Sequence, residues 1–70
     1  MIFKIGDVLT SKDALTGRTH EYRVTKTTQK SVFFQCTKIG QIPVSGEVQK
    51  TRPNERGELW TKSNDRLCKA

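Results

Sequence analysis

The chain has 70 residues, of which 33% are hydrophobic and 29% charged, and its 13 Lys and Arg against 7 Asp and Glu leave a net charge of +6. A chain this short buries only about 60% of the surface that its unfolded form exposes, which predicts one domain over residues 1–70 and no deep pocket for a large cofactor. The positive charge favours an anionic partner, nucleic acid or an acidic protein surface, although the same charge also keeps a small protein dispersed.

Targeting and cofactor signals are missing from the sequence. No apolar run approaches the ~20 residues of a membrane helix, and the opening MIFKIGD has neither a signal-peptide core nor its cleavage site. We therefore expect a cytoplasmic protein with no membrane contact. Cys36 and Cys68 stand far apart without zinc-type spacing, so no metal and no cofactor is expected. Two cysteines are enough for one disulfide between them, but a reducing cytoplasm argues against this bond.

The N-terminal part of the chain predicts one strand and one loop. Residues 2–10 carry apolar side chains on both sides of Gly6 and predict a first strand that is interrupted or bent there, where the absence of Cβ permits a turn or bulge. Residues 11–19 are polar and read as a loop. Ser11 would cap a single helical turn over residues 12–15. Leu15 is the one apolar side chain in this loop able to pin it to the core.

A β-hairpin over residues 20–40 is the clearest feature of the sequence. Both of its runs show the period of two that is typical of a strand with one buried face. Gln29 and Lys30 stand where the hairpin would turn, although they are not a preferred turn pair. The residues expected to point inward are Tyr22, Val24, Val32, Phe34 and Cys36.

The second half of the chain predicts shorter strands separated by turns. Residues 41–44 hold Pro43, which suits an edge strand or an irregular segment. After a turn at residues 45–46, residues 47–52 would form a strand with Val48 inward. Residues 53–57 are the clearest loop, and residues 58–63 the last good strand. Residues 66–70 are expected to be a tail in which Leu67 adds one core contact.

The spacing of these elements predicts an all-β fold, a small five-stranded barrel or sandwich with a central hairpin. The opening KIGDVLTS, the polar loop and YRVTKTTQKSVFF together resemble the early strands of Src-homology-3-like small barrels of the KOW and Tudor types. They are also similar to short β-proteins encoded by phages and plasmids. The aromatic groove of proline-peptide binders and the cage of methyl-lysine readers are missing, since only Tyr22 and Trp60 are available. What the resemblance implies is binding to nucleic acid or to a protein along a strand edge.

Catalysis is not expected. A nucleophile needs a nearby base, and a general acid or base is most often a histidine or a carboxylate with a tuned pKa. His20 is the only histidine and lies in a polar run, where a solvated role is the natural one. The carboxylates are scattered, and the five glycines stand at separate turns rather than in a phosphate loop.

A binding surface is expected on the outward face of the hairpin. Residues 22–46 contain four cations and no acidic residue, and outward Phe33 and Trp60 would supply rings on which bases stack. Either ring would instead close the open end of a small core, since a marginal domain rarely leaves its only Trp in water. The candidate nucleic-acid-binding residues are Arg23, Lys26, Lys30, Phe33, Lys38, Lys50, Arg52 and Trp60.

Two functions are therefore expected, in this order. The first is a non-catalytic basic protein that contacts the phosphates of DNA or RNA. The second is a phage-type protein-interaction module or inhibitor that binds an acidic surface of a host protein, with an edge strand near residues 42–48 pairing with the partner's backbone.

Overall fold

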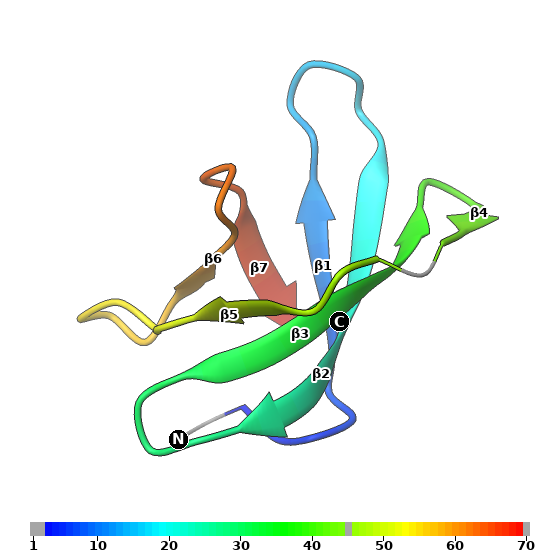
Figure 1. Cartoon of the computed structure of the whole chain (residues 1–70). Helices are drawn as coiled ribbons and strands as arrows, with labels where there is room; N and C mark the ends of the chain where they lie inside the picture. The colour runs from blue at the N-terminus through cyan, green and yellow to red at the C-terminus, as the bar shows by residue number, and fades with distance from the viewer. Residues whose placement is uncertain (1–2, 45, 70) are drawn as a thin grey trace.

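The computed structural model describes residues 3–44 and 46–69, which form seven strands and no helix. All pairings are antiparallel, and the strand order is β4-β3-β2-β1-β7-β6, with β5 pairing along β3 (Figure 1). The expected all-β class is confirmed, but the sheet has seven strands rather than five and is not closed into a barrel within the described residues. None of these residues lies in a helix long and apolar enough to cross a membrane. The strands are β1 (Val8–Lys12), β2 (Thr19–Thr27), β3 (Val32–Ile39), β4 (Ile42–Pro43), β5 (Gln49–Thr51), β6 (Leu59–Trp60) and β7 (Arg66–Lys69).

The long hairpin of β2 and β3 is confirmed, and it carries half of the core. Val24 lies opposite Phe34, and both are almost fully buried. The Tyr22 and Phe34 rings meet edge to face, with centroids 5.5 Å apart, which is a favourable aromatic geometry. Register irregularities follow Glu21 and Val24, and such bulges increase the local twist of a hairpin. In Figure 1 the hairpin is correspondingly long and bent.

The core lies on the inner face of this bent sheet and includes residues from both ends of the chain. Leu59 of β6 is fully buried, and its partner Leu67 on β7 is nearly so. The expected tail is therefore a strand, because β7 pairs with both β1 and β6. Cys36 packs against the core from a half-buried position. The buried hydrophobic residues are Phe3, Leu9, Tyr22, Val24, Val32, Phe34, Leu59 and Leu67.

The predicted bend at Gly6 is a turn that precedes the first strand. Gly6 has φ of +93°, a left-handed conformation that glycine adopts without steric cost. The chain therefore enters β1 only at Val8, and Ile5 is exposed. Next to the turn, Asp7 accepts a hydrogen bond from the Lys4 N–H at 2.8 Å, and its carboxylate lies 3.4 Å from the Lys69 ammonium. Asp7 thus ties the entry turn to the end of β7.

The Asp7 contacts predict a pH dependence of stability. The Lys4 N–H, followed by Lys69, holds the pKa of Asp7 below its ordinary value of about 4. A carboxyl whose folded pKa is depressed contributes stability above its unfolded pKa and loses it as the pH falls through the folded pKa. The difference in Tm between the wild type and Asp7→Asn should therefore be constant from neutral pH down to about 4 and shrink below that. A difference that grows on acidification contradicts this assignment.

The polar loop expected between the first strand and the hairpin is confirmed for residues 13–18, whereas the alternative of a helical turn capped by Ser11 is wrong. Ser11 is buried within β1, and Asp13 organises the loop instead, accepting a hydrogen bond from the Leu15 N–H at 2.9 Å. Leu15 does not pin the loop to the core, since 97% of its surface is exposed. The loop residues bond to one another rather than to the sheet.

The strand register on the other edge of β3 corrects a second expectation. Pro43 lies in edge strand β4, as expected. Val48 was expected to point inward, but it is 48% exposed. The reason is the register of β5, in which Lys50 pairs with the outward-facing Phe33 of β3. Residues two apart share a face, so Val48 faces outward with Lys50. Of the residues expected in strands, turns and the tail, Ile2, Ser45 and Ala70 lie outside the described part of the chain.

Between β4 and β5 the backbone stays close to β3. The Val44 N–H bonds to the Thr37 carbonyl at 2.9 Å, and the Gly46 N–H bonds to the Cys36 carbonyl at 3.0 Å. A Cβ at Gly46 would lie 3.2 Å from the Cys36 Cβ, so glycine permits this close approach. The contact between Gly46 and Cys36 holds the chain next to β3 shortly before β5 begins.

Candidate functional site

An aromatic ring lies between two lysines on the outward face of the sheet. Phe33 of β3 pairs with Lys26 of β2 on one side and with Lys50 of β5 on the other, so the three form one row across three strands. The Lys26 and Lys50 Nζ atoms lie over the half-buried ring, 5.5 Å and 5.7 Å from its centroid. A cation–π contact at an exposed site is worth about 0.5–1 kcal/mol. The ring therefore holds two like charges close together.

Two further cations lie at the hairpin end of this row. Arg52 follows Thr51, the partner of Val32, and is exposed. Lys30 lies in the loop that leads into Val32, and a hydrogen bond of 3.0 Å from the Ser31 N–H to the Thr28 hydroxyl helps to fix that loop. We call the resulting surface the Phe33 face, and it consists of Lys26, Lys30, Phe33, Lys50 and Arg52.

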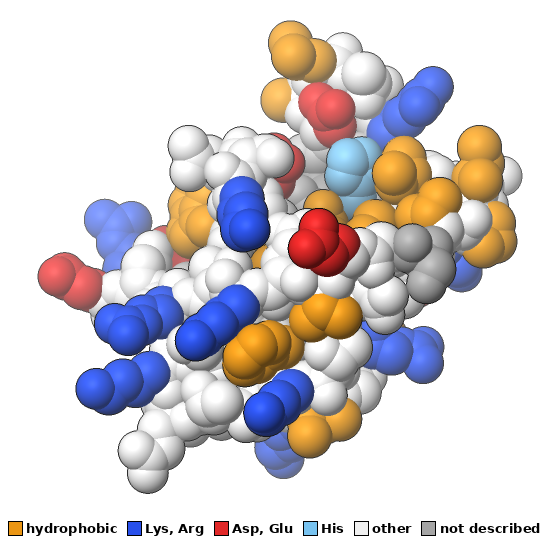
Figure 2. All heavy atoms as spheres, in the orientation of Figure 1, with side chains coloured by type: hydrophobic (Ala, Val, Ile, Leu, Met, Phe, Trp, Pro, Cys, Tyr) orange, Lys and Arg blue, Asp and Glu red, His pale blue; other side chains and the backbone are white. Residues whose placement is uncertain are grey.

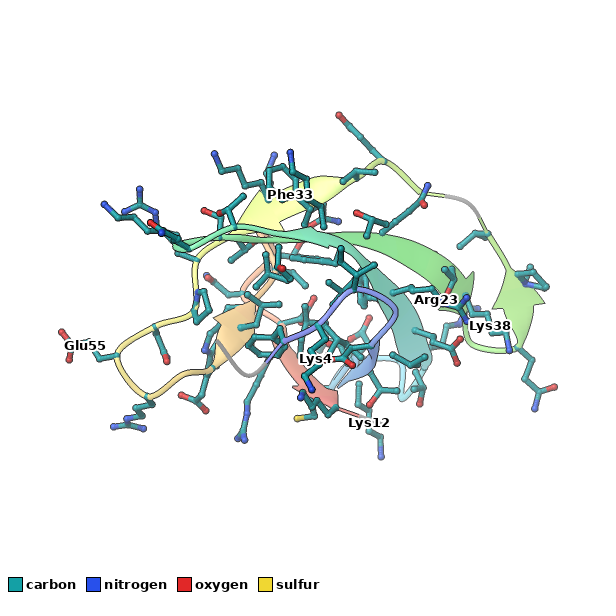
Figure 3. The ribbon with its side chains drawn as sticks, turned by 90° about the horizontal axis from the view of Figure 1, so that it is seen from below. Lys4, Lys12, Arg23, Phe33, Lys38 and Glu55 are labelled. Carbon is teal, nitrogen blue, oxygen red and sulfur yellow. The ribbon has the colours of Figure 1, made fainter. Side chains whose placement is uncertain are left out.

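The Phe33 face is a local concentration of positive charge. Figure 2 shows Lys and Arg side chains gathered around hydrophobic ones on the lower half of this side of the molecule. Phe33 points outward on the upper side of Figure 3, while Glu55 points away from it at the tip of the loop that follows Arg52. Strands β3 and β5 contain no acidic residue. Exposed Glu47 lies shortly before β5, but none of the four cations forms an ion pair with a carboxylate of the described residues. The cations therefore repel one another, and an anion placed among them relieves that repulsion.

The structure does not bring Arg23 and Lys38 into this group. Both are exposed, but Figure 3 shows them toward the other end of the hairpin, away from Phe33. Glu21 is the direct cross-strand partner of Lys38. Residues 22–46 contain no acidic residue, but the surface around Lys38 does, because the neighbouring strand β2 contributes Glu21.

Trp60 also lies apart from the Phe33 face. It belongs to β6, which ends the strand order far from β3, and 36% of its surface is exposed. The interpretation of Trp60 as a core residue is therefore wrong, since Leu59 beside it takes the buried position. Its partner across the strands is Arg66, whose Nε lies 3.2 Å from a Glu58 carboxylate oxygen.

A small cleft lies elsewhere on the molecule and does not suit a cofactor. Its volume of about 200 Å³ is below the roughly 300–1,000 Å³ of small-molecule sites. Two of its cations, Arg66 and Lys69, already pair with Glu58 and Asp7. Among residues 3–44 and 46–69, no group of three or more His, Cys, Asp or Glu could hold a metal ion. The lining residues are Phe3, Gly57, Glu58, Arg66, Leu67, Cys68 and Lys69.

The remaining candidates for reactive chemistry are structural or isolated. His20, expected to be solvated, is half-buried in β2 between Ser11 of β1 and Ile39 of β3. Burial raises the pKa of the Tyr22 phenol, which keeps it neutral within the core. Cys36 and Cys68 are free thiols, so the two cysteines do not form the disulfide that their number left open.

No family model, curated protein or solved structure matches the chain. Function is therefore argued from the Phe33 face, which sequence alternation found in part. Alternation placed Phe33 outward and the count of basic residues included the four cations, but Val48, two residues before Lys50 and exposed, was expected inward. Val48, Lys50 and Arg52 are each two residues apart, and this period of two would have predicted that Val48 points outward with the two cations.

Proposed function

We propose that the protein binds nucleic acid without catalysis, through contacts between backbone phosphates and the Phe33 face. The observation that carries this proposal is the cross-strand row in which Lys26 and Lys50 lie over one ring, with Arg52 and Lys30 at its end. Phosphate oxygens are the groups that such cations contact in protein–nucleic acid complexes. DNA offers one charge per ~1.7 Å of duplex, so several cations on one face can be used at the same time.

The expected binding is weak and largely independent of sequence. Contacts to phosphate position a protein but carry no sequence information. Four such contacts suit a non-specific dissociation constant of about 1–100 µM at physiological salt. The Lys26 and Lys50 side chains lose less freedom on binding than isolated lysines do, because the Phe33 ring already restrains them.

We also propose a finer fold and setting for this activity. The order of entry strand, long loop and bent central hairpin supports an open variant of the Src-homology-3-like small barrel. The two free thiols support a reducing compartment, which fits a cytoplasmic location. The pairing of Asp7 and Glu58 with Lys69 and Arg66 supports structural rather than catalytic carboxylates.

A second candidate function rests on a different surface. Edge strand β4 ends the sheet order, and Ile39 and Ile42, which pair with each other at this edge, are exposed by 37% and 68%. An apolar edge of this kind supports strand pairing with a partner protein. The partner would be an acidic host protein, as for a phage-type interaction module or inhibitor, because the chain carries a net charge of +6.

A pull-down from cell extract, with and without nuclease, separates the two candidates. If the proposal is right, the tagged protein recovers nucleic acid, and proteins recovered with it disappear after nuclease treatment. One protein retained in stoichiometric amount after nuclease treatment, with no nucleic acid in the untreated sample, supports the second candidate instead. Ile42→Glu should abolish that retention, whereas it should leave recovery of nucleic acid unchanged.

A further inference from the structure

We infer that the Phe33 face is built for a single-stranded nucleic acid, with one base stacked on the Phe33 ring and the flanking phosphates on Lys26 and Lys50. This inference rests on the proposed function and adds the kind of strand and the position of one nucleotide. It is carried by the row of three residues across β2, β3 and β5, in which the central residue is aromatic and both outer ones are cations.

The face of the Phe33 ring is accessible from the surface. Lys26 and Lys50 both place an ammonium group over the Phe33 ring, so the π-face is turned to groups at the surface rather than packed into the core. Core contacts are made by the adjacent Phe34, which is fully buried. A ring face that accepts a flexible lysine can accept a base once the lysine moves aside, and stacking on a base is the stronger contact of the two.

The spacing of Lys26, Phe33 and Lys50 across the strands suits one nucleotide with its two flanking phosphates. Neighbouring strands lie about 4.8 Å apart, so the backbones of Lys26 and Lys50 flank that of Phe33 at nearly equal distances. A nucleotide within a strand has a phosphate on each side of its base. With the base on the Phe33 ring, each lysine therefore lies on the side where a phosphate lies. When a lysine ammonium moves from the ring to this phosphate, it exchanges a cation–π contact for a charge-assisted hydrogen bond.

The Phe33 ring can contact a base of a single strand but not an internal base of a duplex. In a duplex both faces of an internal base are covered by its stacked neighbours, so Phe33 has no base to contact. The ring is half-buried between two lysines and does not project as a wedge that could separate base pairs. A duplex would therefore use only the cations of the face, whereas a single strand would use the cations and the ring.

The test compares two labelled single strands with equal numbers of phosphates by fluorescence anisotropy at low salt. One is an oligothymidylate, and the other has abasic residues throughout its interior. The wild type should bind the oligothymidylate about tenfold more tightly, since one stacked base is worth about this factor. Phe33→Leu should remove most of the difference, and Phe33→Tyr should retain it. Trp60→Leu is the matched control, because its ring lies on β6 outside the row, and it should leave the ratio unchanged.

Each outcome decides between the inference and the proposed function. Equal, salt-dependent binding of the two strands by the wild type overturns the stacking inference and leaves phosphate binding in place. A ratio that survives Phe33→Leu but falls in Trp60→Leu also overturns it, because the base then lies elsewhere. Absence of binding to both strands and to a duplex overturns the proposed function together with the inference. Far-UV circular dichroism on each variant identifies any loss caused by unfolding, and the wild-type comparison stands without the variants.

Discussion

Phe34→Ala should lower the free energy of unfolding by about 3–5 kcal/mol. Phe34 is fully buried, packs edge to face on Tyr22 and lies opposite Val24 in the hairpin. Truncation removes a large apolar surface and leaves a cavity that the short sheet can fill only in part. A 70-residue domain has about 4–10 kcal/mol of stability in total. Chemical denaturation followed by circular dichroism should therefore show a transition midpoint far below that of the wild type, and a variant that is largely unfolded at room temperature if the wild-type stability lies at the lower end of this range.

Two control substitutions test whether this loss reports burial rather than apolar content. Leu15→Ala removes an apolar side chain of which 97% is exposed, and it should change stability by less than about 0.5 kcal/mol. Val48→Ala on the outward face of β5 should also cost far less than Phe34→Ala. If Val48→Ala unfolds the protein while Phe34→Ala is tolerated, the strand phases described above are inverted.

Replacement of the four cations of the Phe33 face by glutamine should abolish most binding to nucleic acid. This face variant carries Lys26→Gln, Lys30→Gln, Lys50→Gln and Arg52→Gln and takes the net charge from +6 to +2. Each lost phosphate contact weakens binding and reduces its salt dependence. Anisotropy at low salt should show an affinity about 100-fold lower or more. The variant should stay folded and lose at most about 1–2 kcal/mol of stability, because the side chains are exposed and only the two cation–π contacts to Phe33 are removed.

A matched variant separates the surface from the total charge. Glutamine at Lys4, Lys12, Arg18 and Lys62 gives the same net charge of +2, but these exposed residues lie outside the Phe33 face. Figure 3 shows Lys4 and Lys12 on the side opposite Phe33. This charge-matched control should lose only the small part of the affinity that depends on net charge. Equal losses in the two variants would mean that binding has no defined site on the protein.

The hairpin could be predicted because its pattern is long and its strands pair locally. Val24, Val32 and Phe34 fall on the same phase of a period of two over enough positions to fix the inward face, even though Phe33 on the opposite phase is also apolar. The bulge after Val24 was not predictable, since it depends on how β2 is bent over the core. It leaves the expected inward set intact because it falls between Val24 and Lys26.

The short strands could not be predicted to the same degree. β6 and β7 have two and four residues, too few for an alternation to be recognised. Their pairing depends on Leu59 and Leu67 meeting across the sheet. The apolar residue just before β5, Val48, suggested the wrong face, because β5 takes its phase from its pairing with β3 and not from an apolar pattern of its own.

The candidate site was predicted in composition but not in arrangement. Alternation placed Phe33 outward, and counting located the cations. The row itself depends on β5 pairing with β3, a contact for which the sequence carries no local signal. Grouping cations by sequence segment also included Lys38, which the fold places opposite Glu21. Pairing across strands decides which charges act together, and a single sequence does not reveal it.

The salt dependence of duplex DNA binding, compared between the wild type and the face variant, decides whether the Phe33 face is the site of nucleic-acid binding. For the wild type, four phosphate contacts predict a slope of about −3.6 in a plot of log affinity against log salt concentration. The charge-matched control should keep nearly this slope, while the face variant should approach zero. Equal slopes for the face variant and the charge-matched control, or no binding of the wild type at low salt, would contradict the assignment of the Phe33 face as the site of nucleic-acid binding.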